Sequence, residues 1–327
     1  MSRSIAPHED YGFFGPGSVT WRVWGHPTSL TVGFQRAVVV EELDPFLLAS
    51  VEATDAVRTR PRTRYDRTIR YFATVAFGDS RSVIRASEIL VKVHAQANGI
   101  EPVSGLRYDA NDPDSQLWIL LTGWHSVLYA YERYGPGPLS PEDQTAYWNE
   151  CAVAAELQTC DPAAVPRSRE GIRAYFASVR PRLAASEATQ AMMDHLLNAH
   201  VIFPPLPRIA APGARVASAV LRAATIATMS QWMRELGGLR QPAAVDAAVA
   251  PVMRAHFRAV AASTSAQLAL LSAISPSTRA VVEPAFRGVA ARSPEVLTPA
   301  EARRRHGGVT PLELAARLRD MRPRAAA

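Results

Sequence analysis

Two histidines lie on strongly apolar faces of expected helices, and they are the side chains of this chain best suited to bind a metal. His94 follows Val83 and Leu90 at helical spacing, so the three share one face. His125 occupies the most apolar helical stretch of the chain. A neutral imidazole in an apolar surrounding is a good axial ligand for haem iron. The alternative for each is a core histidine that hydrogen-bonds to a backbone carbonyl.

A second group of polar residues precedes His94 in the chain. Arg67, Arg70 and Thr74 are spaced i, i+3 and i+7, so they lie on one face of a helix. That helix turns at Gly78 into the helix that carries His94, which predicts an antiparallel pair. An arginine and a threonine that face a histidine across such a hairpin could contact a cofactor carboxylate and an oxygen substrate.

Two other interpretations of these residues stay open. The arginines could have a structural role, as ion-pair partners of Asp66 or Asp55. A non-haem metal centre could use His94 and His125 together with a carboxylate such as Asp109.

Several common catalytic classes are excluded by the motifs that the chain lacks. It has no GxGxxG that opens a βαβ unit, no GxxxxGK[ST], no HExxH, no GxSxG and no pair of ExxH motifs. It also has no CxxC or CxxCH. Cys151 and Cys160 are nine residues apart on one expected helix, about 13 Å, which is too far for a disulfide unless the helix breaks. Reduced cysteines are typical of a cytoplasmic protein.

The composition indicates a folded protein that does not bind nucleic acid. The chain has 327 residues, 48% of them hydrophobic, and a net charge of +6. Ten basic and five acidic residues follow Pro276, so the rest of the chain is almost neutral and lacks a broad basic face. There is no signal-peptide pattern, and the longest apolar run, 117–131, is too short to cross a bilayer. We therefore expect a soluble cytoplasmic protein with at most peripheral membrane contact.

Helical spacing dominates the chain and predicts an all-α fold with no sheet of more than two or three strands. Helices are expected over 29–52, 64–77, 80–98, 113–134, 141–159, 168–180, 187–201, 213–236 and 243–274. Asp79, Asp112 and Ser140 are expected N-caps, the last two followed by a proline at the first helical position.

Composition shifts divide the chain into four parts. Residues 1–27 are rich in glycine, proline and aromatic residues and are expected to form a loop or hook. Residues 28–203 form the motif-bearing helical core, and 204–275 an alanine-rich helical part of the same domain, beginning at PPLP. Residues 276–327 are expected to be a basic, partly disordered tail.

Several motifs in register resemble one family. They are GFFGPGSVTWRV (12–23), RYDRTIRYFATVAFGD (64–79), VKVHAQANG (91–99), YDANDP (108–113), LWILLTGWHSVLYAYERYGPGPLSPED (117–143) and ELQTCDP (156–162). Together they resemble the superfamily of the fungal ER-bound oxygenase MpaB and the latex-clearing rubber oxygenase. The resemblance covers residues 10–200 and, more loosely, the helical remainder.

The resemblance implies a globin-like all-α fold around a non-covalent b-type haem. Arg70 and Thr74 match the family's Arg-x3-Thr pair and are the implied catalytic residues. His94 in VKVH matches the proximal iron ligand, with His125 as second choice, and Arg67 joins them as a cofactor-binding residue. The implied function is a haem b-dependent oxygenase that uses dioxygen to oxidise an apolar small molecule. The alternatives are a catalytically silent helical protein that binds a ligand or lipid, and the non-haem metalloenzyme.

The chain departs from the family pattern at three positions. Ala73 stands where the rubber enzyme has a lysine, Leu120 where many members have the histidine of W-x-H-x-T, and Asp44 where relatives often have the histidine of LHP. The family's acidic base has no secure counterpart here. Glu52 and Asp55 are the nearest carboxylates upstream of the arginine, and neither is assigned.

Overall fold

Helices form nearly all of the regular structure in the computed structural model, which describes residues 5–199 and 207–321. The first half contains α1 (Val19–Trp24), the π-helical turn η1 (Ser29–Gly33), α2 (Phe34–Glu41), α3 (Pro45–Thr54), α4 (Ala56–Thr59), α5 (Pro61–Phe77), α6 (Ser80–His94), α7 (Pro113–Tyr134) and α8 (Pro141–Ala155). The only sheet of the described residues is an antiparallel pair, β1 (Asn98–Ile100) and β2 (Arg107–Asp109), with Gly99 opposite Tyr108. The predicted all-α fold is confirmed.

The second half of the chain is also helical. It contains α9 (Arg169–Val179), α10 (Glu187–Leu197), α11 (Ala211–Ala227), α12 (Gln231–Leu236), α13 (Ala243–Ala261), α14 (Thr264–Ile274), α15 (Arg279–Phe286), α16 (Pro299–His306) and α17 (Pro311–Asp320). Short 3-10 turns are η2 (Pro162–Ala164), η3 (Arg180–Arg182), η5 (Arg208–Ala210) and η6 (Pro276–Thr278).

The predicted caps are present and start three of the long helices. The side chain of Asp79 accepts from the backbone N–H of Ser82, that of Asp112 from Ser115, and that of Ser140 from Asp143. Each cap satisfies a backbone N–H that has no partner inside its own helix. These helices therefore begin where the local sequence predicts.

Several expected helices were too long. The helix predicted over 29–52 is η1, α2 and α3, because Asp44 accepts from Phe46 and Leu47 and so caps a new helix. The helix predicted over 80–98 ends at His94, where the chain enters β1. Those predicted over 213–236 and 243–274 are each broken into two helices, at residues 228–230 and 262–263. The prediction over 187–201 and the expected boundary at PPLP partly lie outside the described residues.

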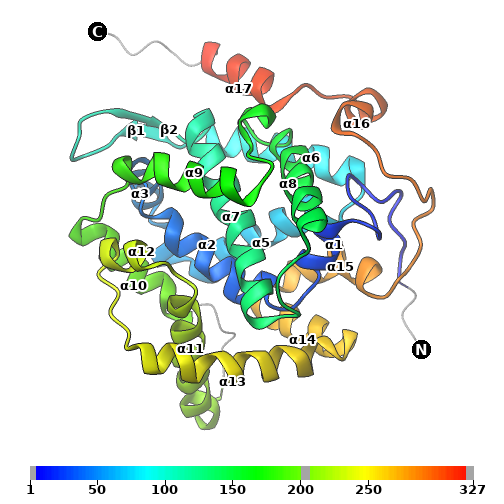
Figure 1. Cartoon of the computed structure of the whole chain (residues 1–327). Helices are drawn as coiled ribbons and strands as arrows, with labels where there is room; N and C mark the ends of the chain where they lie inside the picture. The colour runs from blue at the N-terminus through cyan, green and yellow to red at the C-terminus, as the bar shows by residue number, and fades with distance from the viewer. Residues whose placement is uncertain (1–4, 200–206, 322–327) are drawn as a thin grey trace.

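The core is built around α7, which crosses the middle of the molecule against α2 and η1 (Figure 1). Trp118, Leu121 and Trp124 on this helix are at most 1% exposed. Gly33 lies against the backbone of α7, where a Cβ would come within 2.9 Å of the Cα of Val127. A glycine at this point therefore lets the two elements approach closely.

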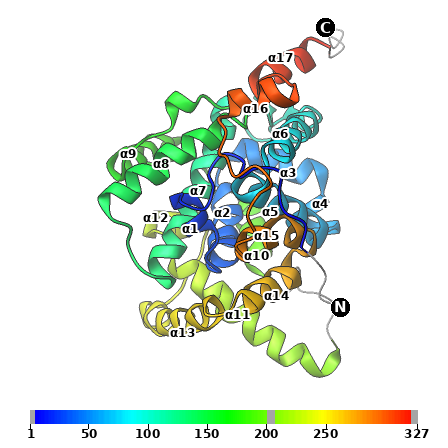
Figure 2. The ribbon, with the colours of Figure 1, turned by 90° about the vertical axis from the view of Figure 1, so that its right-hand side faces the viewer.

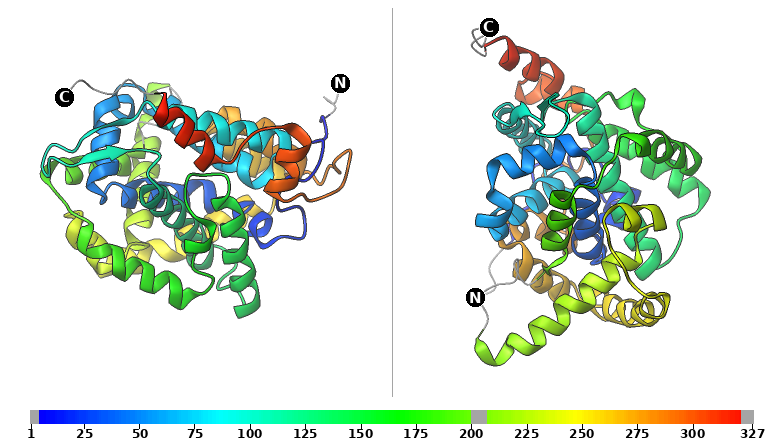
Figure 3. Two further views of the ribbon diagram at one scale, coloured as in Figure 1. Left: turned by 90° about the horizontal axis from the view of Figure 1, so that it is seen from above. Right: turned by 90° about the vertical axis from the view of Figure 1, so that its left-hand side faces the viewer.

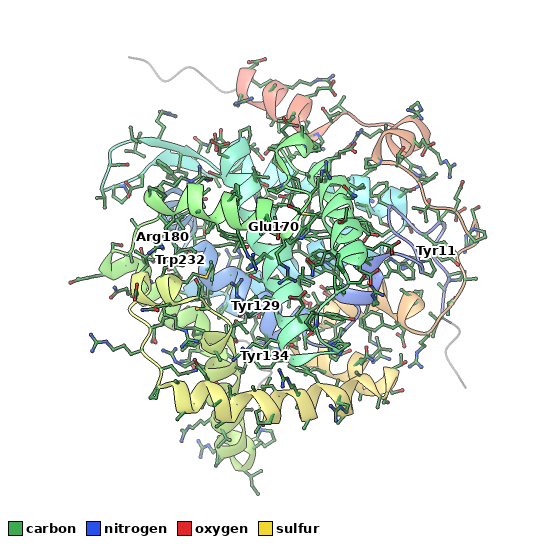
Figure 4. The ribbon with its side chains drawn as sticks, in the orientation of Figure 1. Tyr11, Tyr129, Tyr134, Glu170, Arg180 and Trp232 are labelled. Atoms are coloured by element: carbon green, nitrogen blue, oxygen red, sulfur yellow. The ribbon has the colours of Figure 1, made fainter. Side chains whose placement is uncertain are left out.

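The remaining helices surround this core. α11 and α13 pack on each other along one edge, and α16 and α17 lie along α6 at the opposite edge (Figure 2, Figure 3). The guanidinium group of Arg180 in η3 lies 5.4 Å from the ring centroid of Trp232 in α12, which joins two further segments (Figure 4).

The C-terminal part differs from the expected disordered tail. Its helices α15, α16 and α17 pack on α5 and α6, and Ala302 and Ala315 are buried in those contacts. Nε2 of His306 lies 2.9 Å from the Ser80 hydroxyl, and Arg303 pairs with Glu156 at 3.3 Å. The buried alanines of α16 and α17 gave little hydrophobic signal in the sequence, although these helices pack on α6.

Residues 5–18 form a loop, but the stretch 1–27 that was expected to be a loop also contains the helix α1. The loop is fixed by Asp10, which is buried and accepts from the backbone N–H and the hydroxyl of Ser80 at 2.7 and 2.6 Å. It also shares backbone hydrogen bonds with residues 292–297, such as Tyr11 N–H to Glu295 O. The hook thus ties the start of α6 to the C-terminal segment.

Cys151 and Cys160 are both buried free thiols. In the part of the chain that the structure describes, no individual helix has both the length and the apolarity needed to span a bilayer. The pair α13 and α14 has them only when taken together, and it is bent by 112°.

Candidate functional site

A cavity of about 1230 Å³ lies between α2–α4 and the α5–α6 pair. It brings together the four residues predicted from the sequence to form one site, Arg67, Arg70, Thr74 and His94. Most of the other side chains that line the cavity are apolar. They are Phe34, Val38, Phe46, Leu47, Val51, Val57, Phe72, Ile89, Leu90, Val93, Ile119 and Leu196. The cavity is larger than the roughly 300–1,000 Å³ of a typical small-molecule site.

The tight connection between α5 and α6 creates one wall of this cavity. α5 ends at Phe77, and a Cβ on Gly78 would come within 2.7 Å of the Thr74 carbonyl oxygen. Asp79 then caps α6 immediately. Because Ile69, Ala73 and Phe77 bury the opposite face of α5 in the core, the face with Arg67 and Arg70 is turned to the cavity.

His94 ends α6 and lines the cavity close to the start of α7. Its Nδ1 lies 3.3 Å from Nε2 of Gln116, and no protein partner of its Nε2 is found among the described residues. Burial, together with the positive charge of Arg64, lowers the pKa of His94 to about 4. The imidazole is therefore neutral at pH 7, as a metal ligand must be.

Thr74 and the two arginines of the predicted site differ in their contacts. The Thr74 hydroxyl donates to the Arg70 carbonyl oxygen at 2.7 Å, so its proton is engaged within α5 and its oxygen can still accept. Arg67 and Arg70 are exposed, and neither has an ion-pair partner in the described residues. Asp66 instead accepts from Ser275 and Ser277, which argues against the structural alternative for the arginines.

Two carboxyl groups that the sequence analysis did not single out also line the cavity. Glu41 and Glu42 close α2, and Glu42 is 4% exposed with no hydrogen-bond partner for its Oε2 in the described residues. Burial raises the pKa of each to about 8, against the opposing charge of Arg64. The signal in the sequence was the pair of acids enclosed by Val38–Val40 and Leu43. Both can therefore carry a proton at neutral pH.

His125, the second choice for a metal ligand, does not line the cavity. Its Nδ1 lies 3.4 Å from Nη1 of Arg36, and its ring packs on Phe176. Arg36 is only 1% exposed; it donates to Ser126 at 2.6 Å and lies 5.3 Å from the ring centroid of Tyr129. Burial and the Arg36 charge hold the pKa of His125 well below its usual range. Its hydrogen-bond partner is thus an arginine rather than the expected carbonyl.

The positions that depart from the family pattern also lie away from the cavity. Ala73 and Leu120 are fully buried in the core, and Asp44 caps α3; none of the three lines the cavity. Glu52 and Asp55 do not line it either. Glu52 pairs with Arg58 at 2.7 Å, and Asp55 has a left-handed backbone conformation at the end of α3. The cavity carboxyls come from α2 instead.

The described residues offer no cluster of three histidine, cysteine, aspartate or glutamate side chains that could bind a metal ion. The trio of His94, His125 and Asp109 is not assembled, because His125 lies outside the cavity that the other two line. The geometry therefore favours a single imidazole donor over the non-haem interpretation.

A family model described as "ER-bound oxygenase mpaB/B'/Rubber oxygenase, catalytic domain" matches residues 21–266. The match spans most of the chain and includes every residue of the cavity discussed above. No curated protein and no solved structure matches the chain.

Proposed function

The chain belongs to the family of the ER-bound oxygenase mpaB/B′ and rubber oxygenase catalytic domain, and on this basis we propose that it is a haem b-dependent oxygenase. The observation that carries the proposal is the meeting of His94 with the arginine-bearing face of α5 on one large apolar cavity. The substrate would be an apolar small molecule, with dioxygen as co-substrate.

The residues of the cavity fit a non-covalent haem. A b-type haem that is held by a histidine would use a neutral imidazole for the iron. It would also fit apolar walls around the macrocycle and cations that pair with its two propionates. His94 is the neutral imidazole, and Arg67 and Arg70 are guanidinium groups without a carboxylate partner in the described residues. When bound, the haem would supply the activation of dioxygen, which amino-acid side chains do not provide.

The other residues of the cavity would control charge and protons around the reaction. Arg70 places a permanent positive charge at the cavity, where it would either anchor a haem propionate or stabilise negative charge that develops on oxygen. The Thr74 oxygen would accept a hydrogen bond. Glu41 and Glu42, with pKa values raised to about 8, would hold protons in the apolar wall and act as general acids near neutral pH.

Haem stoichiometry tests this proposal. Protein produced with haem supplied should show a Soret band and about one haem per chain. His94→Ala should abolish the band while the helix content is retained, because His94 ends its helix and contributes little to the core. His125→Ala is the matched control, since it removes an imidazole outside the cavity and should keep the haem. Wild-type protein without haem, or loss of haem only in His125→Ala, would contradict the proposal.

A further inference from the structure

Five arginines line one cavity, and none of them has a carboxylate partner among residues 5–199 and 207–321. Arg60, Arg64, Arg67 and Arg70 come from α5 and the residue before it, and Arg85 comes from α6. In the described residues none of the five guanidinium groups forms an ion pair, and all five are exposed. Elsewhere arginines do find carboxylates, as in the pairs Arg169–Glu132 at 2.6 Å and Arg234–Asp246 at 2.8 Å.

The acidic groups of the cavity do not balance this charge. Glu42 is buried and Glu41 is half-buried in the cavity wall. Desolvation raises the pKa of each to about 8, so both are largely protonated at pH 7. Asp109 is the remaining carboxylate of the lining and lies on β2, near His94. The rim thus keeps a strong positive potential, which attracts and orients anions.

The two propionates of a haem would not use all of this charge. Two carboxylates can pair with two guanidinium groups, and Arg67 and Arg70 lie on the face that the family pattern associates with the cofactor. Arg60, Arg64 and Arg85 are then left over. These three guanidinium groups stay available to bind a second anionic group.

The cavity also offers apolar space that opens to solvent. Its volume of about 1230 Å³ exceeds that of a typical pocket for one drug-sized ligand. Phe46, Leu47 and Val51 form one apolar wall. On α6, Ile89 and Val93 line the cavity although they are 51% and 58% exposed, so the apolar lining reaches the surface. A long apolar chain could enter there.

We propose that the cavity binds an amphiphile with a long apolar chain and an anionic head, a carboxylate or a phosphate. The chain lies along the apolar walls, and the head pairs with the arginines that remain on the rim, Arg60, Arg64 or Arg85. This inference deepens the proposed function, on which it rests for the reaction, by naming the substrate class. The binding itself depends only on the cavity and its arginines.

Equilibrium binding to the full-length protein, as purified, tests the inference by calorimetry. The probes are palmitate, hexadecyl phosphate, the neutral hexadecanol, and acetate or inorganic phosphate as heads without a chain, with each amphiphile below its micelle concentration. We expect the dissociation constant of at least one of the two anionic amphiphiles to be at least tenfold lower than that of hexadecanol. Raising the salt should reduce this difference, because the rim arginines are exposed. The isolated heads should bind weakly, since they lack the chain. A difference between palmitate and hexadecyl phosphate identifies the head.

A matched pair of double variants locates the head. The double variant that combines Arg60→Gln and Arg85→Gln should lose most of the preference for anionic amphiphiles over hexadecanol. Arg62→Gln with Arg81→Gln, on the same two helices but outside the lining, should retain it. Both double variants should keep the circular dichroism spectrum and melting temperature of the wild type, because none of the four arginines has an ion-pair partner in the described residues.

Failure of this inference is separable from failure of the proposed function. Three results would overturn the inference, even if the protein binds haem at full stoichiometry. The first is equal binding of palmitate, hexadecyl phosphate and hexadecanol, and the second is no binding of any amphiphile. The third is an equal loss of the preference in both double variants. If the protein binds no haem but prefers anionic amphiphiles through Arg60 and Arg85, the proposed haem-dependent oxygenase is contradicted. The amphiphile site is then still established.

Discussion

Nδ1 of His94 lies 3.3 Å from Nε2 of Gln116, and the same amide nitrogen donates to the Ala110 carbonyl oxygen at 2.7 Å. The backbone acceptor fixes which end of the Gln116 amide faces the imidazole. Nδ1 therefore accepts a hydrogen bond, and the proton of the neutral ring is on Nε2. A histidine that binds iron through Nε2 carries its proton on Nδ1 instead. Gln116 is thus placed to control the tautomer of His94.

The first prediction concerns this tautomer. In haem-free protein at pH 7, ¹⁵N chemical shifts should show His94 with its proton on Nε2. Gln116→Met, which keeps the side-chain volume but removes the donor, should shift the ring toward a mixture of both tautomers. A wild-type ring already protonated on Nδ1 would contradict the assignment of Gln116 as donor.

The second prediction concerns stability and pH at Glu42. Its pKa is raised from 4.5 to about 8 in the folded state by burial, so the unfolded chain loses this proton at lower pH than the folded chain does. Between pH 4.5 and 8 the unfolded state therefore binds fewer protons, and stability falls as the pH rises. Glu42→Gln removes this loss and should stabilise the protein by about 1–3 kcal/mol at pH 8, with little effect at pH 4.5.

Melting temperatures measured from pH 4.5 to 9 test this expectation. Glu52→Gln is the control, because Glu52 lies on the surface in an ion pair with Arg58 and outside the cavity. A gain for Glu42→Gln that is the same at every pH would show that Glu42 does not hold its proton in the fold.

The third prediction separates function from stability at Arg70. Arg70 is exposed and has no ion-pair partner in the described residues, so Arg70→Ala should change the free energy of unfolding by no more than about 0.5 kcal/mol. Haem should be partly retained, because Arg70 is not the iron ligand. Dioxygen consumption should fall by at least about tenfold, as expected when a charge that stabilises the transition state is removed. Unchanged consumption would remove Arg70 from the reaction.

The fourth prediction concerns the C-terminal helices. Deletion of residues 299–327 exposes the surface of α6 that α16 and α17 cover, and it removes the contacts of His306 with Ser80 and of Arg303 with Glu156. The melting temperature should fall by about 5 °C or more, as expected for the loss of a few kcal/mol. A partly disordered tail, as expected from the sequence, would contribute little to stability, and its deletion would change the melting temperature little. If the deletion variant has the same melting temperature as the full chain, the expectation of a partly disordered tail is restored.

Local sequence determined the helical class and the main starts of the helices. Caps such as those of Asp79, Asp112 and Ser140 act within three residues, so they can be found without knowledge of the fold. The short turn at Gly78 likewise places the face of Arg70 beside the helix of His94. Family motifs in register added the candidate site residues. They also indicated the family, which the match over residues 21–266 confirms.

Tertiary structure decided what depends on burial and on distant partners. The carboxyls of Glu41 and Glu42 hold their protons only because the walls of the cavity remove them from water. His125 lies on an apolar helix like His94, yet the packing of α7 turns it to Arg36 rather than to the cavity. The alanines of α16 and α17 carry little hydrophobic signal, although their small size allows close docking on α6. Whether an arginine has a partner is also settled by residues far along the chain, and so the unpaired rim of this cavity could be seen only in the fold.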